Sequence, residues 1–296
     1  MKSAPINAAI LLLLAVAALA VPTRSWAFET TAAQAILLDF DTGAVLIEKN
    51  ASTPMFPASM TKIMTAYLTF ERLREGSLAM TDTFRVSEKA WAKGGSKMFV
   101  DVGGDVSVAD LLRGVIVQSG NDASIVLAEG IAGSEDAFGT LMTDKAFALG
   151  MTDSMFVNAT GWPDDNHVTT ARDLAILATA MIRDFPDYYA LFGETEFSYN
   201  GIDQSNRNPL LFLDVGADGL KTGHTEASGY GLAASATRGD RRLVLVVNGL
   251  ASERERSSES ARLMGWGFAN FNNYDLFAAG ETVEEVAVWM GEADTV

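Results

Sequence analysis

Apolar, strand-like runs on either side of turns near each end of the chain predict two β-hairpins. Residues 33–40 and 44–50 (AQAILLDF and AVLIEKN) are strand-like runs on either side of a turn that contains Gly43. Residues 230–237 and 241–250 (YGLAASAT and RRLVLVVNGL) repeat this arrangement much later in the sequence. Apolar runs that flank a glycine-containing turn are typical of hairpins. Because the signals between the hairpins are mostly helical, we expect both ends of the chain to pair in one antiparallel sheet.

The segment between the hairpins carries helix signals. Residues 107–118 and 170–183 each begin with a capping box, in which a Ser or Thr is followed three residues later by an Asp. An apolar helix face starts near residue 60 and stops before Gly76. Residues 87–105 contain four glycines and are expected to form a loop. The predicted fold is α/β in the broad sense (α+β), with helices flanking the antiparallel sheet and a helical subdomain inserted.

An apolar run at residues 8–21 predicts a secretory signal peptide over residues 1–27. Lys2 precedes the run, and the small residue at Ala27 marks a cleavage site. The alternative is a membrane anchor, but a run of 14 residues is short of the roughly 18 that a spanning helix needs. We therefore expect an exported protein whose catalytic domain covers residues 28–275. Residues 276–296 are acidic and β-leaning, and would start a truncated β-rich domain or form a tail.

Composition narrows the chemistry. The net charge of −16 argues against nucleic acid and anionic lipid as partners, because both attract basic surfaces. The chain has no cysteine and only two histidines, His167 and His224. Disulfides and a thiol nucleophile are thereby excluded. The sequence predicts neither a metal site nor a cofactor.

The segment FPASMTKIMTAY (residues 56–67) places Ser59 and Lys62 three positions apart at the start of a helix. Residues at that spacing lie on one side of a helix, and burial disfavours a charged lysine. A neutral Lys62 could then accept the proton of the Ser59 hydroxyl. The alternative, a Ser59 helix cap beside an exposed lysine, is the better interpretation of this motif taken alone.

Two later motifs change that balance. Ser119-Gly120-Asn121 falls in a break between two predicted helices, where a hydroxyl and an amide could face one cleft. Lys221-Thr222-Gly223 is predicted to open a strand, with a charge and a hydroxyl for an anionic group. Each motif is weak alone. Ser-x-x-Lys, Ser-x-Asn and Lys-Thr-Gly in that order, in helix, loop and strand, form a strong signal.

With these motifs the chain resembles the low-molecular-mass penicillin-binding proteins, serine-type D-alanyl-D-alanine carboxypeptidases of the β-lactamase/transpeptidase-like fold. The resemblance runs from about residue 30 to 270, through PASMTKIMTAY, LLRGVIVQSGNDA, TARDLAILATAMIRD, NRNPLL and DGLKTGHT. It implies an enzyme that removes the terminal D-Ala from peptidoglycan stem peptides. β-Lactam antibiotics would bind the same serine covalently. The compartment would be the periplasm or cell wall, including the outer face of the inner membrane.

The resemblance also assigns roles to residues. It implies that Ser59 is the nucleophile and Lys62 its base, with Ser119 relaying protons. The other implied residues bind substrate: Asn121 orients it, Lys221 and Thr222 meet its carboxylate with help from Arg207, Gly223 lets it approach the strand, and His224 supplies an oxyanion-hole N–H beside that of Ser59.

Several alternatives remain open at this point. A β-lactamase or DD-endopeptidase could use the same residues, and Glu196 and Asn200 match the Glu-x-x-x-Asn spacing of class A β-lactamases. We interpret that match as a coincidence, because both residues lie in a strand-like segment. A non-catalytic wall-binding protein and a Ser-His-Asp hydrolase using His167 or His224 are further possibilities. Related carboxypeptidases continue into a β-rich domain and a membrane-anchoring helix, which this sequence does not support.

Overall fold

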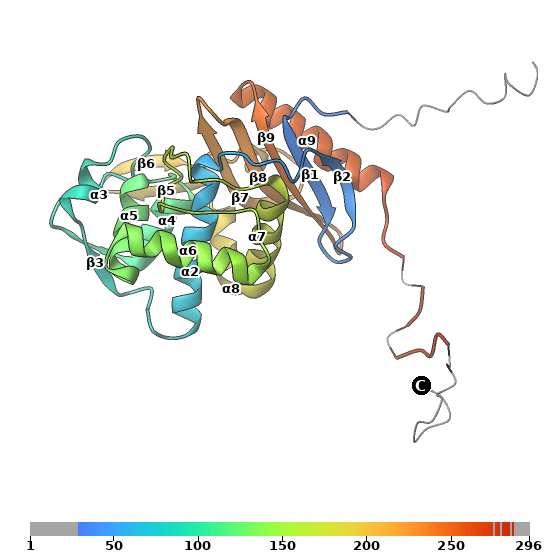
Figure 1. Ribbon diagram of the computed structural model, residues 1–296, viewed down its shortest axis with the longest axis horizontal. Coiled ribbons are helices and arrows are strands. Elements are labelled where there is room, and N and C mark those ends of the chain that lie inside the picture. The colour runs from blue at the N-terminus through green and yellow to red at the C-terminus, as the bar shows by residue number, and fades with distance from the viewer. Residues whose placement is uncertain (1–28, 275, 279, 285, 287–296) are drawn as a thin grey trace, which may run out of the picture. The chain divides into compact units, whose positions relative to one another are not determined.

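The computed structural model describes residues 29–274, 276–278, 280–284 and 286 (Figure 1). By its contacts the chain divides into residues 1–30 and 31–296, and all the elements below belong to the second unit. The predicted signal peptide lies outside the described residues. Among the described residues, no helix is both long and apolar enough to cross a membrane. The described part of 276–286 forms neither helix nor strand.

The main sheet has five antiparallel strands in the order β2-β1-β9-β8-β7. Its strands are β1 (Gln34–Asp39), β2 (Val45–Lys49), β7 (Ala217–Thr225), β8 (Gly229–Arg238) and β9 (Arg241–Leu250). The predicted hairpins are therefore confirmed, and β1 pairs with β9 as expected for ends that meet in one sheet. Strand β7 lies at one edge of this sheet, beside the residues that form the site.

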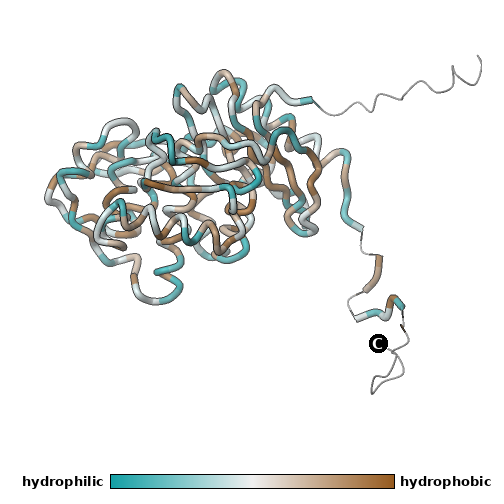
Figure 2. The backbone as a smooth tube through the Cα atoms, viewed as in Figure 1, coloured by the Kyte–Doolittle hydropathy of each residue, from teal (hydrophilic) through white to brown (hydrophobic). Residues whose placement is uncertain are grey.

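Helices cover the main sheet and build the inserted part. They are α2 (Lys62–Arg74), α3 (Glu88–Ala92), α4 (Val108–Ile116), α5 (Asn121–Ala132), α6 (Glu135–Leu149), α7 (Ala171–Asp184), α8 (Pro186–Tyr189) and α9 (Glu253–Asn270). Both α7 and α9 pack on β9, where residues 243–248 are buried without interruption. A strand buried at consecutive positions is covered on both faces. Figure 2 shows apolar stretches along these strands and polar residues in the outer loops.

The smaller elements complete the inserted part. Two small two-stranded antiparallel sheets pair β3 (Thr83–Arg85) with β4 (Asp105–Ser107), and β5 (Glu196–Tyr199) with β6 (Ile202–Ser205). Three 3₁₀ turns are η1 (Ala58–Thr61), η2 (Ala190–Gly193) and η3 (Pro209–Phe212). The mixed antiparallel fold predicted from the sequence is thereby confirmed.

Both predicted capping boxes are confirmed. The hydroxyl of Ser107 accepts a hydrogen bond from the N–H of Asp110 at 3.1 Å, and that of Thr170 accepts one from Asp173 at 3.0 Å. Each bond satisfies a backbone donor that has no partner inside the helix. Helices α4 and α7 therefore begin where the sequence predicts.

Three local predictions were wrong or incomplete. The expected loop at 87–105 contains the short helix α3, capped by the Ser87 hydroxyl, and its last residue starts β4. Lys-Thr-Gly lies inside β7, which begins at Ala217, rather than opening the strand. Helix α2 is buried from Lys62 to Phe70 instead of showing one apolar face. It is a central helix with neighbours on all sides, so polar side chains in it need internal partners.

Candidate active site

Ser59 lies in η1, the 3₁₀ turn that leads into α2, and not in the first turn of the α-helix itself. The preceding residue, Ala58, has a φ of +47°, a strained value for a residue with a side chain. Gly161 and Gly223 pack against the backbone of this turn from two sides, and neither position has room for a side chain. A Cβ on Gly161 would lie 1.7 Å from the Ala58 carbonyl oxygen, and one on Gly223 would lie 2.8 Å from that of Pro57.

Lys62 is buried beside the Ser59 hydroxyl, with only 1% of the residue exposed. Its Nζ donates to Ser59 Oγ at 3.1 Å, to Asn121 Oδ1 at 2.7 Å and to the Thr160 carbonyl at 2.7 Å. Burial, with the charge of Arg207 as the next cause, lowers the pKa of Lys62 to about 7. The sequence-based prediction that Lys62 is buried and directed at Ser59 is confirmed.

The three partners of Lys62 decide what it can do when it is neutral. A neutral amine keeps two N–H donors and one lone pair. Asn121 Oδ1 and the Thr160 carbonyl can only accept hydrogen bonds, so they retain the two N–H groups. The lone pair is then left for Ser59 Oγ, the one partner that carries a proton. This arrangement suits proton transfer from the serine to the lysine.

The Ser119 motif lies in the break between α4 and α5, as predicted. Ser119 is buried with a φ of +59°, and Asn121 joins two parts of the site. Its Oδ1 accepts from Lys62, and its Nδ2 donates to the Gly94 carbonyl at 2.8 Å. Gly120 is needed because a Cβ there would lie 2.8 Å from Asp122 Oδ1. The motif therefore anchors the lysine as well as facing the cleft.

The third motif runs along β7. Lys221 is buried, and burial together with the charges of Lys62 and Arg207 places its pKa well below the usual value. Gly223 allows a close approach to the strand, as predicted, but the group that approaches is the backbone at η1 and not a substrate. The ring of His224 stacks on that of Tyr230, with centroids 3.9 Å apart. Thr222, Gly223 and His224 of β7 thus line the same cavities as Ser59.

Two cavities meet at Ser59. The larger, of about 380 Å³, is lined by Ser59, Gly95, Ser96, Asn121, Thr160, Gly161, Trp162, Pro163, His224, Thr225, Glu226 and Ala227. The smaller, of about 180 Å³, is lined by Ser59, Ser96, Ser119, Arg207, Thr222, Gly223, His224, Glu253 and Arg256. We call them the large and the small cavity. Together with Lys62 and Lys221 behind them, they bring all nine predicted site residues into one region.

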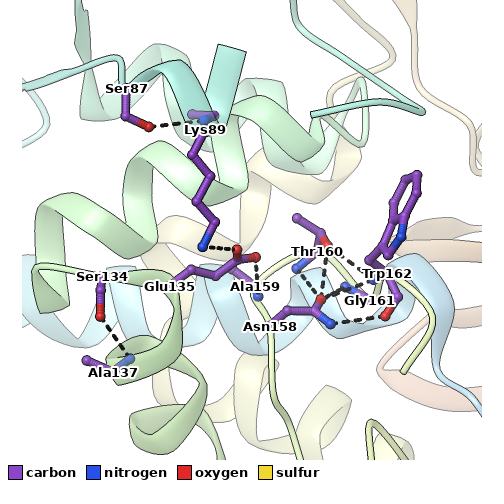
Figure 3. Close-up of polar contacts among 11 residues, drawn as sticks. Ser87, Lys89, Ser134, Glu135, Ala137, Asn158, Ala159, Thr160, Gly161 and Trp162 are labelled. Carbon is purple, nitrogen blue, oxygen red and sulfur yellow. Dashed lines mark hydrogen bonds and ion pairs between the residues drawn. The ribbon is translucent and has the colours of Figure 1, made fainter. Parts of the chain in front are cut away.

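Residues 160–162 line the large cavity, and the side chains of Asn158 and Glu135 hold this segment in place (Figure 3). Asn158 Oδ1 accepts from the N–H groups of Thr160, Gly161 and Trp162 at 2.8–3.1 Å. Glu135 accepts from the Ala159 N–H at 3.3 Å and pairs with Lys89 at 2.8 Å. The Thr160 carbonyl, which accepts a hydrogen bond from Lys62 Nζ, is therefore held in place.

The sequence analysis missed Arg256 and Glu253, which lie in the first turn of α9 and line the small cavity. Arg256 is 6% exposed, and its Nε has no hydrogen-bond partner in the described part of the chain. Its guanidinium lies 5.7 Å from the Tyr230 ring centroid. A buried, partly unpartnered guanidinium at a cavity wall suits an anionic ligand. The only available signal in the sequence was a charged segment directly after the last strand.

Trp162 is a third missed residue, at the wall of the large cavity. Its indole is partly exposed, and the Lys93 Nζ lies 4.3 Å from the ring centroid. Glu196 and Asn200, in contrast, line neither cavity. They lie at β5 and the following turn, where the Asn200 Nδ2 donates to Asp101 Oδ2 at 3.3 Å. Their β-lactamase-like spacing is a coincidence of sequence.

His167 occupies a loop, as predicted, but it is 1% exposed and has a structural role. Its Nδ1 accepts from the Val157 N–H at 3.1 Å, so Nε2 carries the proton and donates to Thr61 Oγ1 at 2.8 Å. Burial lowers its pKa to about 4. Both ring nitrogens are occupied, and among the described residues the hydrogen-bond partner of Ser59 Oγ is Lys62. The geometry does not support a Ser-His-Asp hydrolase.

The buried His167 predicts a specific loss of stability in acid. Its folded pKa is below the unfolded value of about 6.5, so the unfolded chain binds a proton first as the pH falls. The stabilisation is complete above about pH 6.5 and is lost as the pH falls towards 4. We expect His167→Asn to flatten the drop in unfolding free energy between pH 7 and about pH 4.5 by about 2 to 3 kcal/mol. Urea denaturation of the native protein at both pH values measures this.

The second histidine supplies a matched control. His224 is exposed, so His224→Asn should retain the full pH dependence of the native protein. An equal drop in the native protein and in His167→Asn would show that His167 does not couple folding to pH.

Comparison with known proteins gives a consistent result. Residues 20–252 match the D-alanyl-D-alanine carboxypeptidase family. The chain is 44% identical over 268 residues to D-alanyl-D-alanine carboxypeptidase DacC of Escherichia coli (strain K12), over 88% of this chain and 67% of that protein. It therefore spans about two thirds of that curated relative.

Solved structures agree. Penicillin binding protein 5 from Haemophilus influenzae matches with a TM-score of 0.86 and 41% identity, over 90% of this chain and 79% of that one. Penicillin-Binding Protein D2 from Listeria monocytogenes, solved in the cefotaxime-bound form, matches with a TM-score of 0.75 and 29% identity, over 81% of this chain and 98% of that one.

Proposed function

The chain belongs to the D-alanyl-D-alanine carboxypeptidase family, and from this premise we propose which of its residues carry the reaction. It is a serine carboxypeptidase of the penicillin-binding type. The observation that supports the assignment best is the hydrogen bond of 3.1 Å between the buried Lys62 Nζ and Ser59 Oγ, at the junction of two cavities.

Ser59 attacks the carbonyl carbon of the penultimate D-Ala of a stem peptide, and neutral Lys62 takes the hydroxyl proton. The N–H groups of Ser59 and His224 stabilise the negative oxygen of the tetrahedral intermediate. The C–N bond to the terminal D-Ala then breaks, and the leaving amine takes a proton from Lys62, directly or through Ser119. Water finally hydrolyses the ester on Ser59.

The small cavity receives the leaving D-Ala. Its lining carries two guanidiniums, Arg207 and Arg256, the Thr222 hydroxyl and one carboxylate, Glu253, so that cations outnumber acids there. Arg207 donates to the Ser96 hydroxyl, which keeps its head group at the cavity wall. Such a set recognises a carboxylate. The acyl part of the substrate then occupies the large cavity, because Ser59 lies where the two cavities join.

The test is release of D-Ala from diacetyl-Lys-D-Ala-D-Ala, with mass spectrometry of the protein during turnover. We expect free D-Ala and an acyl group on the peptide that contains Ser59. Absence of D-Ala release by the folded protein would exclude the carboxypeptidase activity. Rapid turnover of benzylpenicillin would instead indicate a β-lactamase, and a labelled penicillin that fails to attach to Ser59 would indicate a non-catalytic wall-binding protein.

β-Lactams and localisation are part of the same proposal. A relative of known structure was solved with cefotaxime bound, which supports acylation of Ser59 by β-lactams in this chain. The apolar run at residues 8–21 supports export to the periplasm or cell wall, with removal of residues 1–27. An exported protein that does not begin at Phe28 would contradict the cleavage site.

A further inference from the structure

Glu135 is a buried acid that the proposed reaction does not use. It is the first residue of α6, is only 5% exposed, and lines neither cavity. A buried carboxylate needs polar or charged partners to offset its lost hydration. Lys89 of α3 places Nζ 2.8 Å from Glu135 Oε2, and the Ala159 N–H donates to Oε1 at 3.3 Å. As Figure 3 shows, one carboxylate thereby connects α3, α6 and the segment that contains Ala159.

The segment that Glu135 holds also anchors Lys62. We call residues 158–162 the anchor segment. The Ala159 carbonyl accepts from Thr65 Oγ1 at 2.8 Å, and the Thr160 carbonyl accepts from Lys62 Nζ at 2.7 Å. Both donors belong to α2, the helix that carries the proposed base. The Ala159 N–H and the Thr160 carbonyl belong to adjacent residues, so a displacement of the first also moves the second.

The anchor segment also touches the turn that carries Ser59. A Cβ on Gly161 would lie 1.7 Å from the Ala58 carbonyl oxygen, so the backbone of the segment is packed directly on η1. Asn158 accepts from N–H groups within the segment and fixes its internal shape. Glu135 connects the segment to α3 and α6. A shift of the segment would therefore change the distance between Lys62 Nζ and Ser59 Oγ.

We propose that Glu135 is a positioning residue, which holds the anchor segment so that the Thr160 carbonyl keeps Lys62 Nζ within hydrogen-bond reach of Ser59 Oγ. It acts through the backbone of residues 159 and 160, and not by contact with the substrate. A displacement of about 1 Å in a catalytic group can lower a rate by about 10²-fold. This inference rests on the proposed function, in which Lys62 takes the Ser59 proton, and it uses a residue outside the three motifs.

The test follows the labelling of Ser59 by a fluorescent penicillin at about pH 9. Burial lowers the pKa of Lys62 to about 7, and the charge of Glu135 opposes that shift. At about pH 9 Lys62 is neutral with or without this charge, so the rates report geometry. The final extent of labelling gives the fraction of molecules with a competent site. The rate constant at saturating penicillin does not depend on that fraction.

Two variants of Glu135 differ in the hydrogen bond to Ala159. In Glu135→Ala we expect the rate constant at saturating penicillin to fall about tenfold to thirtyfold. The half-saturating concentration should stay unchanged, because Glu135 lines neither cavity. Glu135→Gln keeps an oxygen that can accept from the Ala159 N–H. It should therefore label within about threefold of the native rate constant.

Asp173 supplies a matched control. It is also a buried acid in the first turn of a helix, α7, and is 2% exposed. Its carboxylate also holds a loop, since Oδ2 accepts from the Asp153 N–H at 3.0 Å. That loop does not include the Thr160 carbonyl, and Asp173 lines neither cavity. Whatever its effect on the folded fraction, Asp173→Ala should keep the native rate constant.

The outcomes separate the two proposals. Failure of the native protein to label overturns the proposed function, and this inference with it. Native labelling together with an unchanged rate constant in Glu135→Ala overturns this inference alone. Equal slowing in Glu135→Ala and Asp173→Ala also overturns it, because loss of any buried acid at a helix start would then slow the reaction. If Glu135→Gln is as slow as Glu135→Ala, the hydrogen bond to Ala159 is not responsible and the inference is wrong.

Discussion

Lys62→Ala is expected to lower the rate of Ser59 acylation by about 10⁴-fold, approaching the loss caused by Ser59→Ala. The reason is the hydrogen bond from Lys62 Nζ to Ser59 Oγ, combined with a pKa near 7. Among the described residues, Lys62 is the hydrogen-bond partner of Ser59 Oγ, so it is the group placed to take the proton. Covalent labelling with a fluorescent penicillin, followed over time, measures the loss.

The same argument predicts a pH dependence. Only neutral Lys62 can accept the proton, and its pKa is about 7. We expect kcat/KM to be constant above about pH 7 and to fall about tenfold per pH unit below it. The acid limb for D-Ala release from diacetyl-Lys-D-Ala-D-Ala reports this value for the free enzyme. An acid limb near pH 10 would mean that burial does not tune the lysine.

Three further variants test whether Lys62 acts as the base or only as a positive charge. Lys62→Arg keeps a cation but removes the lone pair, because guanidinium remains protonated, so it should be as impaired as Lys62→Ala. Lys145→Ala removes a partly buried lysine that pairs with Glu71 and lines neither cavity, and should label normally. His224→Ala should retain much more acylation than Lys62→Ala, since only its backbone N–H is proposed to act. Full labelling of Lys62→Ala would show that another base serves Ser59.

The sequence predicted the main parts of the fold and site because they depend on local signals. The hairpins around Gly43 and Gly239 follow from strand-like runs beside a glycine turn. The starts of α4 and α7 follow from capping boxes that use one side chain and one nearby N–H. The motif around Ser59 could be placed because residue types and order, rather than geometry, identify it.

The remaining features depend on contacts between distant segments. Nothing near Gly223 in the sequence shows that η1 packs against it, since the contact is with Pro57, far back along the chain. The five-residue helix α3 is too short to show a periodic pattern. The buried environment that lowers the pKa of Lys62 requires α5 and residues 158–162 to close around it. These are consequences of packing, which composition and spacing do not encode.

Arg256 was missed for the same reason, and its position predicts the second large effect. It lies 35 residues after Lys221 in sequence and reaches the small cavity only because α9 returns onto the sheet. We expect Arg256→Ala to lower kcat/KM for diacetyl-Lys-D-Ala-D-Ala by about 10²-fold. Loss of a buried charged partner from a carboxylate costs about 2 to 5 kcal/mol, and the other cations at this end compensate in part.

A change in the substrate distinguishes recognition from folding. The same tripeptide with a C-terminal amide lacks the negative charge, so the native protein should strongly prefer the free acid. In Arg256→Ala this preference should shrink by about the same factor of 10², whatever fraction of the variant is folded. Arg256→Lys should retain part of it, since a lysine keeps the charge but not the planar pair of donors.

An unchanged preference for the free acid in Arg256→Ala would assign carboxylate binding to another residue of the small cavity. If Arg256→Ala discriminates acid from amide as well as the native protein, its burial at the wall must serve packing on Tyr230. The carboxylate would then be bound by Arg207, whose guanidinium is hydrogen-bonded to Ser96. Measuring Arg207→Ala beside Arg256→Ala shows which arginine binds the carboxylate. Both side chains line the small cavity, but of the two only Arg256 has a buried Nε without a hydrogen-bond partner among the described residues.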